Sequence, residues 1–311
     1  MVGVKEVAEN IYMIDDNLYS IPKFGSVYLI NEEKKALIDT GPTPSANVVL
    51  DGIKETGVSP ADIDYLIVTH IHLDHAGGAG FLIRDMPKAQ AVVHNRGARH
   101  LIDPTRLVSS AMAAQDRVDE GLVKETEVVP IAAERVKSVY DGDTIRLGER
   151  QTLRIIDAPG HAPHELCIHE SRNNGLFTGD AAGICVGAHK ALIMVNAPPS
   201  FDLELSLTTV KKLMEIQPSR LYYAHFDVAD DAEQKLRWAL DTLNLWDDIT
   251  SQAVKYNRFN EAEERLMAQA YDTLEPIRGQ WPLVYEYMAK HDVPMSIGGF
   301  LKYYRDKHGM N

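Results

Sequence analysis

The sequence predicts an α/β fold followed by a helical C-terminal region. Short apolar runs broken by turn residues fill the first 70 residues, and a second strand-rich stretch covers residues 135–180. Beyond residue 200 the hydrophobic period changes to 3.6. The two strand-rich stretches predict two packed β-sheets, and 311 residues suffice either for one large domain with a small appendage or for two equal halves.

The first stretch alternates strands with one helix. Residues 46–57 have helical spacing and end on Gly57, a common residue after a helix C-terminus. Ile, Val and Tyr are enriched in the runs around this helix, as in β-strands. The expected strands are residues 11–14, 26–30, 35–41 and 63–70.

The middle of the chain is expected to contain two helices around a strand. Residues 76–86 open with small residues and read as a helix that stops before Pro87. Residues 90–95 form a short buried strand, and residues 96–127 have a polar helical period. The turns that divide the second strand-rich stretch are Asp141–Gly142, Leu147–Gly148 and Asn173–Gly175.

The C-terminal stretch has three apolar helix faces. They are Leu203, Leu207, Val210 and Met214; Leu236, Leu240 and Leu243; and Leu266, Ala270 and Leu274. Residues 226–231 are polar and acidic, so we place a boundary there. The expected organisation is a first domain over residues 1–228 and a helical region over residues 229–311, acting as a lid or a dimer contact.

Charge and composition exclude some partners. The 45 acidic and 32 basic side chains give a net charge of −13, which repels nucleic acid and anionic lipid. The first residues lack an apolar run of signal-peptide length, and no segment has the ~20 apolar residues that span a bilayer. We therefore expect a cytoplasmic protein that binds neither nucleic acid nor membrane. Cys167 and Cys185 lie in apolar stretches and are expected to be buried, reduced and without chemistry.

The segment from Thr69 to His75, THIHLDH, follows an apolar strand and precedes a Gly-rich helix start. Three imidazoles and a carboxylate at a strand end crowd into one small volume, which is costly without a cation. Imidazole and carboxylate are ligands that zinc, iron and manganese accept. The segment therefore predicts a metal site.

THIHLDHAGG resembles the signature of the metallo-β-lactamase superfamily. The resemblance extends to LIDTGP at residues 37–42, DAPGHAPHE at 157–165, LFTGDAA at 176–182 and YYAHFD at 222–227. It covers about residues 10–228 in the family's order. It implies an αββα sandwich, in which two mixed β-sheets lie face to face with helices outside.

The resemblance also implies a ligand set for two divalent metal ions, with zinc preferred and iron or manganese also acceptable. The first ion would bind His70, His72 and His161, and the second Asp74, His75 and His225, with Asp180 bridging the two. The positions of His161 and Asp180 at strand exits support their assignments independently. Asp39 would accept a hydrogen bond from a ligand imidazole, or else form a turn. His164 and His189 are weaker candidates for contact with substrate.

The implied activity is hydrolysis of a small thioester or lactone, with an activated water as nucleophile and Asp74 as the catalytic proton acceptor. Two alternatives remain open: a persulfide dioxygenase-like oxidoreductase with one iron on His70, His161 and Asp180, and a metal-retaining binding protein with little turnover. Residue His72, where flavodiiron enzymes have glutamate, argues against that branch. The negative charge argues against the ribonuclease branch.

Aromatic residues are frequent in the C-terminal region, and they could wall the active-site mouth, form a homodimer contact or fill the region's own core. They are Trp238, Trp246, Tyr256, Tyr271, Trp281, Tyr285, Tyr287, Tyr303 and Tyr304. The stretches KYYRDKHGMN and YYAHFD do not reproduce the glutathione-contact motifs associated with glyoxalase II enzymes. A glutathione thioester is therefore a less favoured substrate.

Overall fold

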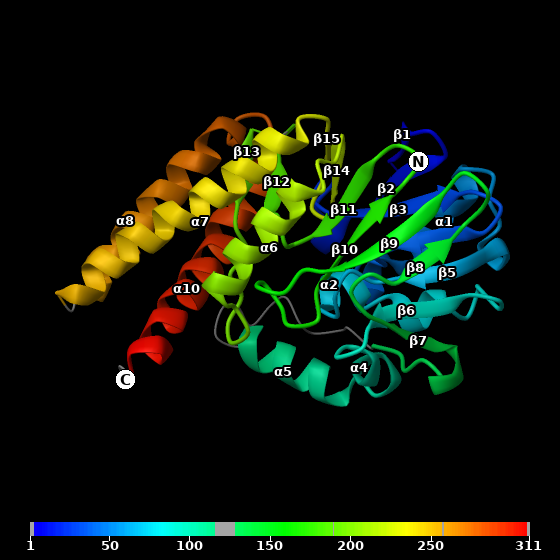
Figure 1. Ribbon diagram of the computed structural model, residues 1–311, viewed down its shortest axis with the longest axis horizontal. Helices are drawn as coiled ribbons and strands as arrows, with labels where there is room; N and C mark the ends of the chain where they lie inside the picture. The colour runs from blue at the N-terminus through cyan, green and yellow to red at the C-terminus, as the bar shows by residue number, and fades with distance from the viewer. Residues whose placement is uncertain (1–2, 116–127, 189, 257, 310–311) are drawn as a thin grey trace. The chain divides into compact units, whose positions relative to one another are not determined.

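The computed structural model describes residues 3–115, 128–188, 190–256 and 258–309 (Figure 1). The chain divides into two compact units. Unit 1 comprises Met1–Asp157 and Leu166–Phe177, and unit 2 comprises Ala158–Glu165 and Thr178–Asn311. A domain boundary between residues 228 and 229 stays a prediction.

The first sheet of unit 1 is mixed, with the described strands in the order β1-β2-β3-β4-β5-β6-β7. They are β1 (Val4–Ala8), β2 (Ile11–Asp15), β3 (Ser26–Asn31), β4 (Lys35–Ile38), β5 (Ile63–Ile67), β6 (Gln90–His94) and β7 (Val136–Val139). Strands β1 to β4 pair antiparallel, whereas β4 to β7 pair parallel. All four strands expected in the first 70 residues are present, and β1 is an additional strand.

A second sheet begins in unit 1 with β8 (Thr144–Arg146), β9 (Thr152–Asp157) and β10 (Leu166–Glu170), which pair antiparallel in chain order. The next strand, β11 (Gly175–Gly179), pairs with β10 and ends in unit 2. There β14 (Arg220–Tyr223) and β15 (Val228–Ala229) follow β11 in the same sheet. The two expected sheets are therefore present.

Side chains of β3 alternate between two apolar layers, as the two-residue period of a strand requires. Val27 and Leu29 belong to a buried cluster with Val49 and Ile53 of helix α1 (Ala46–Glu55). Tyr28 points to the opposite face, where its ring lies 5.3 Å from that of Phe177 on β11. The first sheet is thus covered by a helix on one face and by the second sheet on the other.

The prediction of one helix over residues 76–86 is wrong. The chain forms two short helices, α2 (Leu73–Ala76) and α3 (Ala79–Leu82), separated by Gly77 and Gly78. Gly78 N–H donates to the Gly41 carbonyl at 2.9 Å, and a Cβ on Gly78 would lie 3.0 Å from the Thr40 carbonyl oxygen. The glycines allow this close backbone approach, which breaks the helix.

The prediction of helix over residues 96–127 is confirmed in part, because the described residues form two helices with a break between them. Helices α4 (Ala98–Ile102) and α5 (Thr105–Gln115) are separated by Pro104, which disfavours helical backbone at the residue before it. Residues 116–127 lie outside the described part of the chain.

Unit 2 is mainly helical, as the 3.6-residue period predicts. Its helices are α6 (Leu203–Glu215), α7 (Ala232–Lys255), α8 (Phe259–Leu274), α9 (Pro282–Tyr287), a π-helix (Met288–Asp292) and α10 (Val293–His308). It also contains a hairpin of β12 (Ile184–Val186) and β13 (Ala191–Ile193), which the sequence reading does not anticipate. The described residues also form short 3₁₀ turns, which are Leu18–Ser20, Thr43–Ser45, Pro60–Asp62 and Ala133–Arg135 in unit 1 and Glu275–Ile277 in unit 2.

Helices α7, α8 and α10 pack against one another (Figure 1), and Trp246 of α7 is buried. The Trp246 and Phe300 rings lie 5.6 Å apart, and the Trp246 indole N–H donates to Gln269 at 2.7 Å. Trp246 therefore fills the region's own core, while Tyr256 is 70% exposed. Within the described residues, no helix combines the length and apolar character needed to cross a membrane.

Cys167 and Cys185 are buried free thiols, as expected. Burial raises the pKa of the Cys185 thiol to about 12, so the nucleophilic thiolate is scarce at neutral pH.

Candidate metal centre

Parallel pairing brings the first site residues to one sheet edge. Strands β4 and β5 run parallel, so their carboxyl ends, which Asp39 and Thr69 follow, lie on the same side. Asp39 has a left-handed φ of 60°, and its N–H donates to the Ile67 carbonyl at 2.8 Å. This turn ends β4 at Ile38, earlier than the predicted strand over residues 35–41, and holds the Asp39 side chain next to the strand exit.

Asp39 is the centre of a buried hydrogen-bond network and is 3% exposed. Its carboxylate accepts from the Thr69 N–H at 2.7 Å and from the Thr69 hydroxyl at 3.0 and 2.9 Å. The Nδ1 atom of His75 lies 3.1 Å from Asp39 Oδ2. The carboxylate thus contacts an imidazole as expected, and it also contacts Thr69, which the sequence reading does not single out.

These contacts fix which nitrogen of two imidazoles carries hydrogen. A carboxylate accepts, so His75 Nδ1 donates to Asp39, leaving Nε2 able to bind a cation. The Thr69 hydroxyl spends its single hydrogen on Asp39, so it accepts from His70 Nδ1 at 3.2 Å. In the neutral ring, Nε2 of His70 is therefore also the nitrogen that can bind a cation. Asp39 orients this ring indirectly, through the Thr69 hydroxyl.

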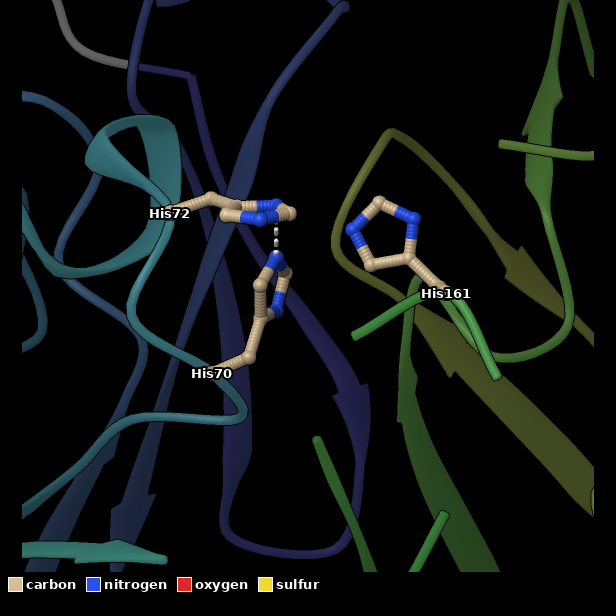
Figure 2. Close-up of side chains that lie close together, drawn as sticks. All are labelled: His70, His72 and His161. Atoms are coloured by element: carbon tan, nitrogen blue, oxygen red, sulfur yellow. Dashed lines mark hydrogen bonds between the residues drawn. The ribbon is translucent and has the colours of Figure 1, made fainter. Parts of the chain in front are cut away.

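His70 Nε2 faces His72 Nδ1 at 3.0 Å, and Figure 2 shows the bond between the two rings. Two imidazole nitrogens at this separation share one proton, and a divalent cation accepting nitrogen ligands can replace it. The His70 and His75 rings lie 4.0 Å apart, and His75 Nε2 lies 3.5 Å from Asp74 Oδ2. We call the candidate ligands His70, His72, Asp74 and His75 the first ligand group.

Helix α2 holds His75 in place. The Thr40 N–H and hydroxyl both donate to the His75 carbonyl, at 2.9 and 2.7 Å. The side chain of Asp74 on the same short helix is 23% exposed, whereas that of His75 is 3% exposed. Asp74 is therefore the member of this pair that solvent reaches.

Unit 2 contains three further candidate ligands in separate segments, His161, Asp180 and His225, which we call the second ligand group. His161 lies in the loop after β9 and is drawn in Figure 2, Asp180 directly follows β11, and His225 follows β14. The side chain of Asp180 faces both imidazoles: Oδ2 lies 3.6 Å from His161 Nε2, and Oδ1 lies 3.5 Å from His225 Nε2. All three residues are at most 4% exposed.

His161 and Asp180 of the second group are held by different partners. His161 Nδ1 lies 2.9 Å from the Val195 carbonyl, which can only accept, so Nδ1 carries a hydrogen and Nε2 is the nitrogen that a neutral ring offers to a cation. The Asp180 N–H donates to Glu165 Oε1 at 2.7 Å. In a neutral imidazole the lone pair of Nε2 and the facing carboxylate oxygen repel each other, and a cation between them removes that repulsion. The donor chemistry therefore fits a metal ion.

Helix α6 supports the loop that carries His161. Gly160 has a φ of 149°, and a Cβ there would lie 2.4 Å from Ser206 Oγ on α6. The Asp202 N–H donates to the Gly160 carbonyl at 2.9 Å, and the Thr209 hydroxyl donates to the Pro159 carbonyl at 2.6 Å. The Pro159–Gly160 pair is therefore packed tightly on a helix.

His164 and His189 are the weaker candidates for contact with substrate. His164 is half-buried, and its contact with a substrate stays a prediction. His189 lies outside the described residues. His94, which lies in none of the motifs that carry the resemblance, is buried with Nε2 3.5 Å from Asp157 Oδ1, and burial lowers its pKa.

Asp16 is a buried carboxyl next to the first ligand group that the sequence reading missed. It is 2% exposed, its Oδ1 accepts from the Leu18 N–H at 3.1 Å, and burial, followed by the neighbouring charge of Asp15, raises its pKa to about 7. Its oxygens would lie 2.3 and 2.4 Å from a Cβ on Gly25 or Gly41. Both glycines therefore make room for this carboxyl.

The functional residues missed from sequence differ in the signal they carry. Thr69 and Glu165 lie inside the quoted motifs THIHLDH and DAPGHAPHE, so attention to every polar position in a motif would have found them. Asp16 lies in no motif. The carbonyl of Val195 has no residue-type signature, because every residue has one.

A family model described as the metallo-beta-lactamase superfamily matches residues 21–225. The chain belongs to this superfamily. The match confirms the resemblance seen in the sequence, and it spans every member of the two ligand groups. Two mixed β-sheets with flanking helices and a helical C-terminal region confirm the predicted superfamily fold.

Several superfamily relatives align with this chain. It is 26% identical over 212 residues to the metallo-beta-lactamase fold-containing protein ST1585 of Sulfurisphaera tokodaii, covering 66% of this chain and 73% of the relative. It is 24% identical over 188 residues to the acyl-coenzyme A thioesterase MBLAC2 of Bos taurus, covering 57% and 64%. The crystal structure of TTHA1429 from Thermus thermophilus aligns over 91% of this chain and 89% of its own, with a TM-score of 0.61 and 20% identity.

Proposed function

We propose that this chain is a dinuclear metal-dependent hydrolase of a small thioester or lactone. The observation that carries the proposal is the contact that three imidazoles make through Nδ1. His70, His75 and His161 each face an oxygen partner with Nδ1, so in the neutral ring Nε2 is the nitrogen that can bind a metal.

Three ligand sets support the proposal. His70, His72 and His161 could hold one ion; Asp74, His75 and His225 could hold another; and Asp180 could act with His70 and His75. Two divalent ions bound by these residues would lower the pKa of a water molecule toward neutrality and stabilise negative charge on a carbonyl oxygen. Zinc is our first candidate, since neutral imidazole and carboxylate suit it.

Asp74 is the best candidate for holding the proton released when water attacks the acyl carbon. Its side chain is 23% exposed, whereas that of Asp180 is 4% exposed. A proton acceptor must exchange its proton with solvent after each turnover, which burial hinders. Asp180, facing two imidazoles, is better suited to binding cations throughout the cycle.

Thioesters are our favoured substrates because one relative, 24% identical to this chain, is an acyl-coenzyme A thioesterase. A thiolate or alkoxide leaving group can be stabilised directly by a cation. The proposal includes a small-molecule substrate and no nucleic acid, since the net charge of −13 repels polyanions.

The test is metal content followed by a substrate panel. The full chain is purified without added metal, and zinc, iron and manganese are measured per chain, with about two ions expected. An acyl-coenzyme A thioester and a lactone are then assayed with wild type, Asp74→Asn and the control Asp51→Asn, whose side chain is 64% exposed on α1. Asp74→Asn should lose hydrolysis and Asp51→Asn should retain it.

Two results would overturn the proposal. Absence of bound metal even after reconstitution would remove its basis. A single iron per chain, with oxygen uptake in the presence of a persulfide, would instead support the oxidoreductase alternative on His70, His161 and Asp180.

A further inference from the structure

The segment after β13 connects His161 to the C-terminal helix α10 through one peptide group. The Val195 carbonyl accepts from His161 Nδ1 at 2.9 Å. The other pole of the same peptide, the Asn196 N–H, donates to Ser296 Oγ on α10 at 3.4 Å. Because the six atoms of a peptide group are coplanar, holding its N–H fixes the direction in which its carbonyl points.

Helix α10 also contacts the next carbonyl. Gly299 lies one turn after Ser296 on the same helix face. A Cβ on Gly299 would lie 1.6 Å from the Asn196 carbonyl oxygen and 3.1 Å from the Pro198 nitrogen. Backbone therefore packs directly on backbone here, and any side chain at position 299 would displace the segment that holds Val195.

The whole connection is buried. Asn196 and Ser296 are 0% exposed, Val195 is 5% exposed and His161 is 4% exposed. Hydrogen bonds shielded from water are stronger than exposed ones and polarise their neighbours. The orientation of the His161 ring is thus coupled to the position of α10 through contacts that are shielded from water.

We propose that α10 is a brace for the metal ligand His161, with Ser296 and Gly299 as positioning residues. This inference rests on the proposed function, since it assigns the C-terminal helical region a role in metal affinity at that imidazole. Ser296 orients the peptide that fixes the His161 tautomer, and Gly299 sets how closely the helix approaches. The helical region is then part of the metal site and is needed beyond any role as a lid.

The sharpest test compares neighbouring glycines of α10 in the full chain. Gly299→Ala forces the helix away from Asn196, whereas a Cβ on the exposed control Gly298 would meet no atom within 4 Å. Zinc affinity is measured by competition with a chromophoric chelator, and the visible spectrum of the cobalt-substituted protein reports ligand geometry. We expect Gly299→Ala to lower the affinity for one of the two zinc ions about tenfold or more, which is the effect of losing a hydrogen-bond partner of a metal-binding imidazole. Its cobalt spectrum should change, and Gly298→Ala should match wild type in both.

A second readout does not need metal. Nitrogen-15 NMR of the chelator-treated protein reports the His161 tautomer, which should be Nδ1–H in wild type and Gly298→Ala. In Gly299→Ala we expect a mixture of tautomers. If Gly299→Ala does not fold, Ser296→Ala provides the test. This substitution removes the hydroxyl that accepts the Asn196 N–H without creating a steric overlap, and it should lower zinc affinity about threefold or more.

The inference and the proposed function fail in different ways. Wild type that binds no zinc or cobalt contradicts the proposed function. Wild type that binds two ions, alongside a folded Gly299→Ala or Ser296→Ala with unchanged affinity, spectrum and tautomer, overturns the brace alone.

Discussion

The two ligand groups consist of the same kinds of side chain, imidazole and carboxylate, but differ in how the chain holds them in place. The first group comes from six consecutive residues, and two of its imidazoles depend on a single carboxylate, Asp39, directly or through Thr69. In the second group, residues 161, 180 and 225 lie far apart in sequence, and the partners of His161 and Asp180 are separate. A change behind the first group should therefore spread to both ions, whereas a change behind the second should stay local.

Asp180→Asn should have the largest effect, because Asp180 is the point at which the second group would act on both ions. The amide keeps the size of the side chain and the backbone bond to Glu165 but removes the charge that faces two imidazoles. We expect loss of at least one bound ion and a fall in hydrolysis on the order of 10³-fold, or ~4 kcal/mol of transition-state stabilisation. Metal analysis and steady-state kinetics would measure both.

Asp51→Asn, a carboxylate exchange on the surface of α1, serves as the control for that experiment. Full metal content in Asp180→Asn would show that Asp180 holds neither ion and would contradict the bridging role.

Asp39→Asn should lower the affinity for both ions, although Asp39 is not a candidate ligand of either ion. The amide offers one acceptor oxygen where the carboxylate accepts from Thr69 and His75, and its NH₂ group opposes one of these donors. We expect a loss of about 10- to 100-fold in zinc affinity at each ion, the range found for residues that orient ligand imidazoles. Chelator competition would resolve the two dissociation constants.

Thr69→Val separates the two branches of the Asp39 network. It removes the hydroxyl that links Asp39 to His70 and leaves the direct contact with His75. Only the affinity for the ion bound by His70 should fall. Equal weakening of both ions in Thr69→Val, or of only one in Asp39→Asn, would contradict the shared-carboxylate arrangement.

The contrast between the groups also explains what sequence could predict. The candidate ligands are residues of particular types at strand exits, so the motif around His70 to His75 and the positions of His161 and Asp180 are legible without a structure. The supports are less visible, because the partner of His161 is a backbone carbonyl contributed from a position 34 residues later. The helix break at Gly77 and Gly78 was missed for the same reason: it depends on the distant backbone of residues 40–42.

Asp16 tests how far charge near the first group is tolerated. Its pKa is raised to about 7 by burial, compared with 3.8 ordinarily. Between about pH 4 and pH 7 the unfolded chain loses this proton while the folded chain keeps it, so this carboxyl lowers the free energy of unfolding as pH rises. Asp16→Asn does not titrate, and in chelator-treated protein its stability advantage over wild type should be roughly 2 kcal/mol larger at pH 8 than at pH 5.

Urea unfolding at the two pH values measures this difference, and Asp51→Asn should show no such pH dependence. A stability difference between Asp16→Asn and wild type that stays constant with pH would show that Asp16 is already ionised at pH 5 in the folded protein. Bound cations should reduce the effect, because positive charge favours the ionised carboxyl.

Glu165 tests the local character of the second group and should have the smallest effect. Its Oε1 accepts the Asp180 N–H at 2.7 Å, and both residues are at most 3% exposed. Glu165→Gln retains an acceptor oxygen and should change metal content and stability little. Glu165→Ala leaves a buried N–H without its acceptor, so we expect a loss of about 1–2 kcal/mol in unfolding free energy and weaker binding at Asp180. Thermal unfolding and chelator competition on the pair separate the hydrogen bond from the charge, since both variants remove the charge and only alanine removes the acceptor. Equal losses in the two variants would mean that the Glu165 charge, rather than this hydrogen bond, supports Asp180.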